Sequence, residues 1–180
     1  DTAHVPYGNK SPQTVIERSL KIVSFLEQKN VKLIVIGCNT ASAVAQKKIL
    51  QITNIPTLNV ITPCIAQALK ITKNNNIAII GTHTTINSKA YQNQIHILND
   101  KIKVITQACP LLVPMIEEGL MKQQITQDII NMYLNKLKKA QYDTLILGCT
   151  HYPLIKKIIS EKIAQNTEII DSSIITAKHV

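Results

Sequence analysis

Two segments of the sequence share one pattern: LIVIGCNT, residues 33–40, and TLILGCTH, residues 144–151. Each contains a run of apolar residues and ends in Gly-Cys followed by a polar pair. Such runs are typical of strands that are covered on both faces of a parallel sheet. A third segment, AIIGTHTT at residues 78–85, has Gly81-Thr82 where the others have Gly-Cys. The pattern predicts parallel strands whose carboxyl ends carry polar loops, which is where open α/β sheets bind ligands.

Amphipathic helices are expected between these strands. Residues 11–28 have Ser11 as N-cap and Pro12 in the first turn, and their apolar residues recur on one helical face. Residues 125–140 and 154–164 are predicted to be helical for the same reason. Weaker strands are predicted at residues 57–61, 102–106 and 168–170.

The alternation of strands and helices predicts an α/β fold. The repeated Gly-Cys segments indicate two pseudo-symmetric lobes, each with a parallel-rich sheet flanked by helices. We assign residues 1–61 and 174–180 to the first lobe and residues 62–173 to the second. We expect the active site in the cleft between the lobes, because each lobe would bring one Gly-Cys loop to the carboxyl end of its sheet.

The composition indicates a globular chain with a core of its own. The chain has 180 residues, of which 45% are hydrophobic and 17% are charged. No apolar stretch reaches the roughly 18 residues expected of a membrane span, and the first ten residues lack the pattern of a signal peptide. We therefore expect a cytoplasmic protein with no membrane partner.

The chain is basic, with a net charge of +9 at pH 7. A positive charge favours anionic partners, either nucleic acids or small acids. The lysines are dispersed, however, and their densest groups are pairs such as Lys138-Lys139. Aromatic residues, which stack on single-stranded bases, make up only 3% of the chain. A solvated basic surface is therefore favoured over a nucleic-acid site.

Four cysteines occur at wide spacings, and none lies in a CxxC motif. This arrangement argues against a disulfide framework. It also argues against a metal site, because Cys149-x-His151 is a single close pair with no second pair to complete a ligand set. Cys64 and Cys109, each next to a proline, are interpreted as structural. The remaining two thiols are either buried filler or reactive groups.

Cys38 and Cys149 each follow a predicted strand at the point where the next helix is expected to begin. A helix N-terminus lowers the pKa of a thiol and binds carboxylates. A nucleophilic hydrolase needs one such thiol, and a redox pair is usually close in sequence. A reaction that removes a proton from one face of a stereocentre and returns one to the other face needs two opposed acid-base groups. Two thiols from two similar lobes would meet that need.

Other polar residues could assist. His151 lies two positions after Cys149 and could act as its acid-base partner, while Asp1 and Glu117 are single carboxylates for which a solvated surface position is the default. Gly8 either lets the backbone approach a ligand or merely permits a turn after Tyr7. Asp171 is expected to cap a helix.

Six segments, in a fixed order along the chain, carry a family resemblance. They are DTAHVPYGNKS (1–11), GCNTASA (37–43), IGTHTTINSKAY (80–91), CPLLVPMIEEG (109–119), LGCTHYPL (147–154) and DSSIITA (171–177). These segments resemble the motifs of glutamate racemases, which belong to the aspartate/glutamate racemase superfamily. The resemblance implies interconversion of L- and D-glutamate without a cofactor or metal, for bacterial peptidoglycan. It also implies two α/β lobes around the substrate and, often, a homodimer.

The resemblance assigns roles to individual residues. Cys38 resembles the thiol that acts on the D-enantiomer, and Cys149 the thiol that acts on the L-enantiomer. The residues that match polar groups assisting the thiols are Asp1, Glu117 and His151, with Glu118 adjacent to Glu117. The residues that match substrate-binding positions are Tyr7, Gly8, Asn39, Thr40, Thr150 and His151.

The sequence also departs from the family pattern. The strand and DSGxGG loop with which the family usually opens are not matched, the C-terminal helix is cut short at Val180, and His4 stands where the family often has Arg. The first lobe would then lack its N-terminal strand and helix, so we expect a fragment that is unstable or inactive alone. Two alternatives remain: an aspartate or other amino-acid racemase of the same superfamily, or a catalytically silent protein that binds an anion or DNA gyrase.

Overall fold

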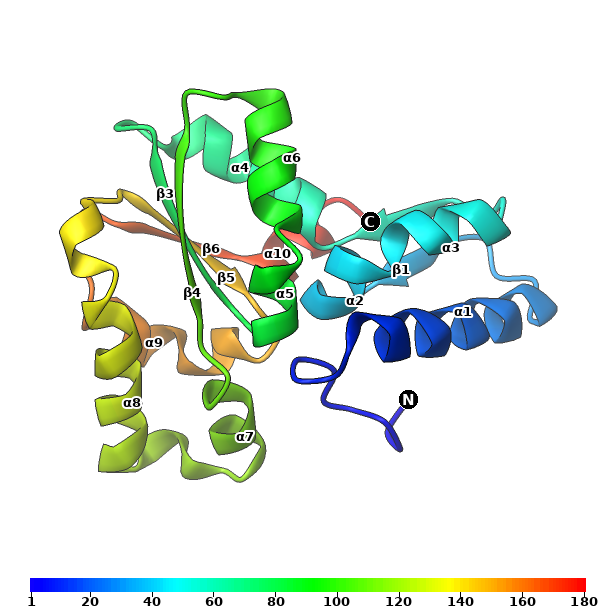
Figure 1. Cartoon of the computed structure of the whole chain (residues 1–180), viewed down its shortest axis with the longest axis horizontal. Helices are drawn as coiled ribbons and strands as arrows, with labels where there is room; N and C mark the ends of the chain where they lie inside the picture. The colour runs from blue at the N-terminus through cyan, green and yellow to red at the C-terminus, as the bar shows by residue number, and fades with distance from the viewer.

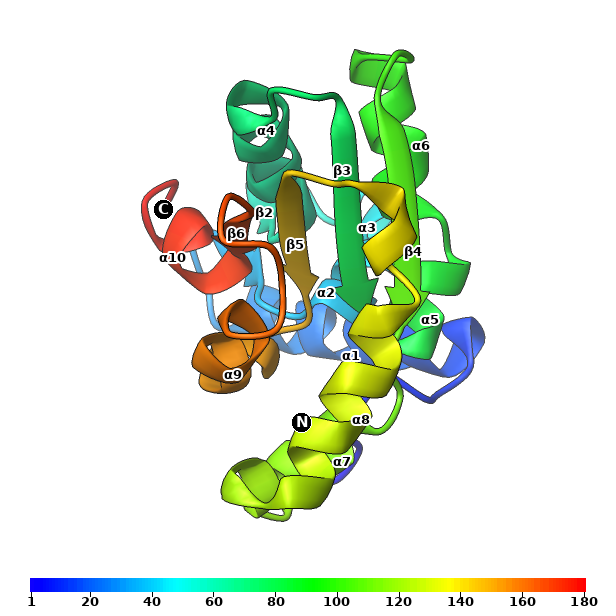
Figure 2. The ribbon, with the colours of Figure 1, turned by 90° about the vertical axis from the view of Figure 1, so that its left-hand side faces the viewer.

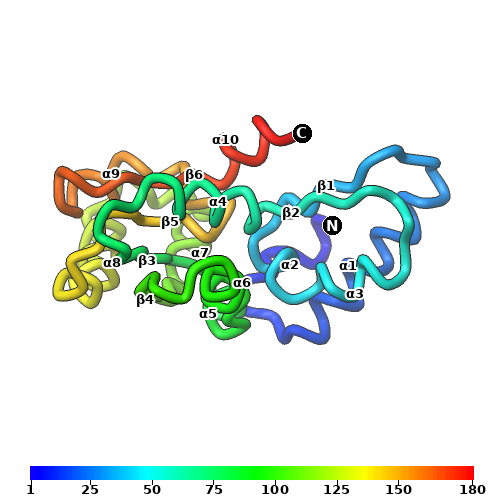
Figure 3. The backbone as a smooth tube through the Cα atoms, turned by 90° about the horizontal axis from the view of Figure 1, so that it is seen from above, coloured from blue at the N-terminus to red at the C-terminus, as the bar shows by residue number.

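The computed structural model describes residues 1–180 and contains two lobes that lie side by side (Figure 1). The N-terminal part of the chain forms the first lobe, and the chain from α4 onward forms the second. Seen from above, the two lobes separate along the long axis of the molecule (Figure 3).

Helices and short strands alternate along most of the chain. The first lobe contains α1 (Pro12–Gln28), β1 (Ile34–Ile36), α2 (Asn39–Val44), α3 (Gln46–Ile52) and β2 (Thr57–Asn59). The second begins with α4 (Ile61–Ile71), β3 (Asn76–Gly81), α5 (His83–Asn87), α6 (Ala90–Leu98), β4 (Lys103–Ala108) and α7 (Leu112–Glu117). It continues with η1 (Leu120–Lys122), α8 (Gln124–Asn135), η2 (Lys138–Ala140), β5 (Thr144–Gly148), η3 (Tyr152–Ile155), α9 (Lys156–Ser160), β6 (Glu168–Asp171) and α10 (Ser172–Ala177), where η marks a 3-10 helix.

Every strand pair is parallel, which confirms the predicted α/β fold. The first lobe has a two-stranded sheet, β1-β2, and the second has a four-stranded sheet in the order β4-β3-β5-β6. In the larger sheet Gly81 at the end of β3 pairs with Gly148 at the end of β5. The segment with Gly81-Thr82 and the segment with Gly148-Cys149 therefore end at the same edge. Figure 2 shows β5, β3 and β4 side by side.

Each lobe has its own apolar core. One face of the larger sheet packs against α4 and α6 through Ile77, Ile79 and Ile146. The other face packs against α7, α8 and the segment around α9 through residues that include Ile80 and Leu147. A separate cluster joins α1, α2 and α3 to β1 in the first lobe. The alternation of faces along each strand is what the two-residue period of a sheet requires.

Two local predictions are confirmed. The side chain of Ser11 caps α1 by accepting a hydrogen bond from the Thr14 N–H. Asp171 caps α10 by accepting from the N–H groups of Ser173 and Ile174. Both caps are short-range contacts between a side-chain oxygen and the free N–H groups of a helix start.

Three expectations are corrected. Strand β1 is buried on one face only, because its helices pack on one side and Val35 is 41% exposed on the other. The helix predicted over 125–140 ends at Asn135, and a separate 3-10 helix follows. The helix predicted over 154–164 is only Lys156–Ser160, because Leu154 and Ile155 belong to the 3-10 helix Tyr152–Ile155 that precedes it.

The C-terminal helix α10 packs against α4, β5 and β6. Ile175 of this helix packs against the apolar cluster of the second lobe. No helix of the structure combines the length and the apolar character that crossing a bilayer requires.

We predict that Gly148→Ala destabilises the protein by about 1–3 kcal/mol. A methyl carbon at this position would lie 2.8 Å from the backbone oxygen of Ile80 in the adjacent strand. Gly37→Ala is the matched control, because Gly37 precedes the other cysteine of the repeated pattern and has nothing within 4 Å of the added carbon. Urea denaturation measures both free energies of unfolding. Equal losses in the two variants would contradict this account of the close strand approach.

Candidate active site

A cavity of about 810 Å³ lies between the two lobes and is lined by both Gly-Cys loops. This volume falls in the range of small-molecule sites, roughly 300–1,000 Å³. All ten residues that the sequence singled out line this one cavity: Asp1, Tyr7, Gly8, Cys38, Asn39, Thr40, Glu117, Cys149, Thr150 and His151. The structure therefore brings together thiols that are far apart in the sequence.

Cys38 enters the cavity from the start of α2. Its backbone is extended and its sulfur accepts a hydrogen bond from the Ala41 N–H at 3.5 Å, as an N-cap side chain does. Local helix capping thus fixes where the first thiol points.

Cys149 enters from the second lobe at the end of β5. Its sulfur lies 3.7 Å from Nδ1 of His151, and Nε2 of the same ring contacts a carboxylate oxygen of Glu117 on α7. The His151 and Glu117 side chains are 28% and 58% exposed. The three groups form a chain from sulfur through imidazole to carboxylate, an arrangement that lets a ring nitrogen exchange a proton with the thiol.

The expectation of lowered thiol pKa values is wrong for this structure. Burial raises the pKa of Cys38 and outweighs the lowering effect of hydrogen bonds from Ala41 and Thr40. Burial also raises the pKa of Cys149 to about 12, although the N–H groups of His151 and Tyr152 oppose it. Burial destabilises the thiolate by more than the N–H groups of the helix start stabilise it.

The two thiols influence each other electrostatically. A charge on Cys38 raises the pKa of Cys149 further. Like charges disfavour each other when they share a site, so the pair favours one ionised thiol over two.

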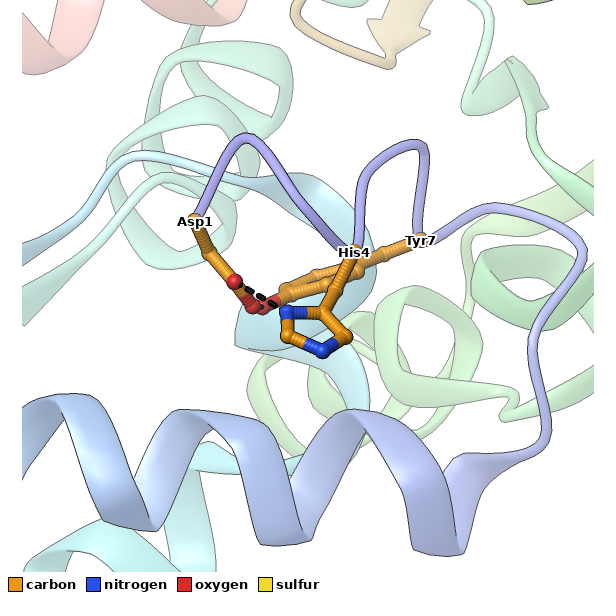
Figure 4. A network of polar contacts seen from close by, with 3 residues as sticks. All are labelled: Asp1, His4 and Tyr7. Carbon is orange, nitrogen blue, oxygen red and sulfur yellow. Dashed lines mark hydrogen bonds and ion pairs between the residues drawn. The ribbon is translucent and has the colours of Figure 1, made fainter.

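Asp1, His4 and Tyr7, at the start of the chain, form a polar network (Figure 4). Asp1 and Tyr7 line the same cavity as Cys38. One carboxylate oxygen of Asp1 accepts a hydrogen bond from the Tyr7 hydroxyl, and the other lies 2.5 Å from Nδ1 of His4. Burial raises the pKa of Tyr7, and a charge on Cys38 raises it further. The hydroxyl of Tyr7 is therefore a neutral donor held by Asp1. His4 stands where glutamate racemases often have arginine, and its ring nitrogen contacts the carboxylate of Asp1.

Asn39 and Thr40 are buried and their side chains bridge the lobes. The amide oxygen of Asn39 accepts from the Tyr91 hydroxyl at 2.6 Å, and its nitrogen donates to Ser172 at 3.3 Å. The Thr40 hydroxyl lies 3.0 Å from the hydroxyl of Thr82. Asn39 was expected to bind substrate, but both the oxygen and the nitrogen of its side-chain amide form hydrogen bonds with residues of the second lobe.

Gly8 permits a close approach of backbone to a side chain. A Cβ at this position would lie 2.5 Å from the methyl carbon of Thr82. Its carbonyl oxygen also accepts a hydrogen bond from the Thr84 N–H at 3.1 Å. The glycine is therefore needed where the loop after Tyr7 meets the second lobe.

Several cavity residues were not assigned a role by the sequence analysis: Thr2, Val5, Pro6, Ile22, Thr82, Val113 and Pro114. Glu118, named there as the neighbour of Glu117, also lines the cavity. Thr82 had a signal, since it occupies in the third repeated segment the position that Cys38 and Cys149 occupy in the other two. The apolar residues of α7 and α1 carried no such signal, because their sequence pattern is that of ordinary core positions.

The lining contains no lysine and no arginine. Carboxylates in this cavity would therefore be held by N–H groups and hydroxyls, which bind anions without a full positive charge. No group of three or more His, Cys, Asp or Glu side chains is placed to hold a metal ion.

Comparison with known proteins agrees with this geometry. The family model described as Asp/Glu/Hydantoin racemase matches residues 1–180. A glutamate racemase of Neisseria meningitidis serogroup C is 49% identical over 99% of this chain and 66% of its own length. One from Geobacter metallireducens is 45% identical over 100% of this chain and 67% of its own length.

A solved glutamate racemase from Francisella tularensis, in complex with D-glutamate, superposes with a TM-score of 0.93. It is 38% identical, and the match covers 99% of this chain and 66% of that one. The protein belongs to the Asp/Glu/Hydantoin racemase family. The chain spans about two thirds of the length of the curated relatives it matches.

We predict that the protein loses stability as the pH rises above about 9. Burial raises the pKa of Cys64 and of Cys109 to about 12. As the pH rises, the unfolded chain therefore releases these protons at a lower pH than the folded protein does. Each thiol lowers the free energy of unfolding by about 1 kcal/mol between pH 8 and pH 10. Urea denaturation across this range should show the decline. Cys109→Ala should flatten it, and an unchanged slope in that variant would contradict the assignment.

Proposed function

We propose that the protein interconverts L- and D-glutamate by proton transfer between the α-carbon and two opposed thiols. The observation that carries the proposal is the convergence of Cys38 and Cys149, one from each lobe, on a single cavity. Substrate identity rests on the glutamate racemases to which the chain is 45–49% identical. The Francisella protein, which was solved with D-glutamate, supports the same assignment.

The reaction uses the thiols in opposite protonation states. A Cys38 thiolate takes the α-proton from D-glutamate, and the electron pair of the broken C–H bond stays on the substrate as a carbanion. The Cys149 thiol then donates its proton to the other face, which yields L-glutamate and a Cys149 thiolate. The reverse reaction exchanges the two roles, and no oxidant or reductant is needed.

The surroundings of the two thiols support a mechanism in which only one of them is ionised at a time. The raised pKa values keep the thiols protonated near neutrality, so a base must remove one proton before turnover. His151 is placed to do this for Cys149, and Glu117 holds the ring by its other nitrogen. Once formed, a thiolate with a raised pKa is a stronger base for a weak carbon acid.

The substrate contacts follow from the lining. Thr40, Thr82 and Thr150 line the same cavity, and N–H and hydroxyl groups of this kind suit the two carboxylates of glutamate. Tyr7 and Gly8 close another side of it. Asp1 offers a carboxylate acceptor to the ammonium group. Asn39 contributes by holding α2 against the second lobe.

We further propose the setting that the resemblance implies: a cytoplasmic homodimer that supplies D-glutamate for peptidoglycan. Four free cysteines fit a reducing compartment. Depletion of the protein in its host should be rescued by added D-glutamate. Growth without that supplement after depletion would contradict the cell-wall role.

Two competing functions have distinct signatures. An aspartate racemase would equilibrate aspartate enantiomers faster than glutamate enantiomers. A catalytically silent binding protein would leave glutamate unchanged, and contact with DNA would weaken steeply as salt rises. Circular dichroism of glutamate and aspartate solutions over time distinguishes a glutamate racemase, an aspartate racemase and a catalytically silent protein.

We predict that Cys38→Ser and Cys149→Ser each lower kcat for glutamate racemisation by about 10²–10⁴-fold, because each removes an acid-base group of the reaction. Polarimetry of the full-length protein measures the loss. Cys64→Ser is the control, since that thiol lies in the core and outside the cavity. A doubly substituted protein that still equilibrates the enantiomers would refute the two-thiol proposal.

We predict a difference between two adjacent carboxylates. Glu117→Gln should lower kcat by about tenfold, because it replaces the carboxylate that holds the His151 ring through Nε2 with a weaker, neutral acceptor. Glu118→Gln is the matched control, because Glu118 lines the same cavity and makes no contact with the ring. Steady-state kinetics in both directions give the comparison. Equal losses from the two variants would argue against a specific His151–Glu117 pair.

A further inference from the structure

The side chain of Tyr91 reaches both Gly-Cys loops. Its hydroxyl donates a hydrogen bond of 2.6 Å to the amide oxygen of Asn39, the residue that follows Cys38. Its ring carbon Cε2 lies 3.5 Å from the position that a methyl carbon on Gly148 would occupy, and Gly148 precedes Cys149. Cε2 is bonded to the ring carbon that carries the hydroxyl. The same end of one side chain therefore lies close to both loops.

The turn before α6 fixes where this side chain starts. Tyr91 is the second residue of α6, and Lys89, just before the helix, has a left-handed backbone with φ of 55°. The Ser88 hydroxyl accepts a hydrogen bond from the Ala90 N–H at 3.2 Å. A left-handed conformation is disfavoured for lysine by itself, so the contacts around the turn must favour it. The turn lets α6 follow α5 directly and contact α2 of the first lobe (Figure 3).

The hydrogen bond between Tyr91 and Asn39 is buried and crosses from one lobe to the other. Both residues are 1% exposed. A buried phenol hydroxyl needs a partner, and the partner of Tyr91 is the Asn39 amide. Burial raises the pKa of Tyr91, so the hydroxyl keeps its proton and remains a donor. The amide nitrogen of Asn39 donates to Ser172 at 3.3 Å, so both ends of the amide are held by the second lobe.

Tyr91 itself lies outside the candidate active site. Cys38, Asn39 and Cys149 line the cavity, whereas Tyr91 does not. Its influence on a bound substrate therefore passes through the two loops. Transfer of a proton to and from one carbon depends on the placement of both acid-base groups, and a small misplacement lowers the rate strongly.

We propose that Tyr91 is a positioning residue that sets the separation of the two thiols. The hydroxyl holds Asn39, and with it the start of α2, where Cys38 is the N-cap residue. The ring lies against Gly148, so the position of the second loop is referred to the same side chain. This inference rests on the proposed function for the importance of that separation, but its first test needs no substrate.

The first test measures the placement of the thiols with reagents that bridge two cysteines. Dibromobimane, or the longer bismaleimidoethane, is added to the full-length protein. Mass spectrometry then compares Cys38–Cys149 bridges with products in which only one of these thiols has reacted. After the first thiol has reacted, bridging is an intramolecular step whose yield depends on where the second thiol lies. Tyr91→Phe removes only the hydroxyl and should lower the bridging ratio for dibromobimane by about two- to fivefold.

Two further comparisons test the route of the effect. Asn39→Ala should lower the bridging ratio by itself, and the addition of Tyr91→Phe should then have no further effect, because the hydroxyl acts through Asn39. Tyr133→Phe is the matched control and should leave the ratio unchanged. It also removes a buried tyrosine hydroxyl of the second lobe, but that hydroxyl accepts from the Leu111 N–H at 3.4 Å rather than from either Gly-Cys loop.

Turnover gives a second readout. Tyr91→Phe should lower kcat for glutamate racemisation by about tenfold in both directions and change KM by less than about twofold, because the placement of the thiols matters most in the transition state. Circular dichroism gives the folded fraction by which kcat is corrected. Tyr133→Phe should leave both constants unchanged.

Each outcome decides the inference. An unchanged bridging ratio or an unchanged kcat in Tyr91→Phe overturns it, whatever happens to the melting temperature. It also fails if Tyr133→Phe lowers the ratio equally, or if Tyr91→Phe lowers it further in the Asn39→Ala protein. If neither reagent bridges the thiols of the unaltered protein, this inference and the proposed function fail together. If the bridging results are as expected but the unaltered protein does not racemise glutamate, Tyr91 still sets the separation and only the proposed function fails.

Discussion

The contact between the two lobes depends on buried polar side chains. Apart from Ala43 of α2, which packs against the cluster of the second lobe, the apolar clusters lie within the lobes, and hydroxyl and amide groups connect α2 to the second lobe. Thr40 meets Thr82, and Asn39 meets Tyr91 and Ser172. Buried polar groups are costly unless each finds a partner, so these contacts define one relative placement of the lobes. The position of Cys38 relative to Cys149 follows from that placement.

This polar contact also connects structure to chemistry. A shared apolar core would tolerate small shifts between the lobes, but hydrogen bonds have narrow distance limits. Proton transfer to a carbon atom needs the same accuracy, since the base must lie within hydrogen-bond reach of the proton it removes. The groups that hold the lobes together are therefore placed next to the groups that react.

Local signals in the sequence were sufficient for much of the fold. Ser11 and Asp171 cap helices as predicted, because capping depends on residues two or three positions away. The repeated Gly-Cys pattern predicted the parallel strands and located both thiols at one cavity. Strand β1 was misjudged because an apolar run does not reveal how many neighbours its sheet has, and Val35 is exposed.

Features that depend on distant residues were not predictable in the same way. The sequence indicated a lowered thiol pKa from the helix start, but the extent of burial, which decides the sign, is a property of the assembled lobes. The choice of Glu117 over Glu118 as the partner of His151 depends on the orientation of α7. Thr82 carried a hint in its repeat position, whereas nothing local marked Tyr91 as a neighbour of Asn39.

The central claim is that two thiols act on opposite faces of one carbon. Racemisation in D₂O, stopped at low conversion, tests it most directly by measuring deuterium at the α-carbon of both enantiomers. With D-glutamate as substrate, the account predicts L-glutamate that carries solvent deuterium and recovered D-glutamate that keeps its hydrogen. A product that retains the substrate's own hydrogen would show that a single base works on both faces, and would contradict the account.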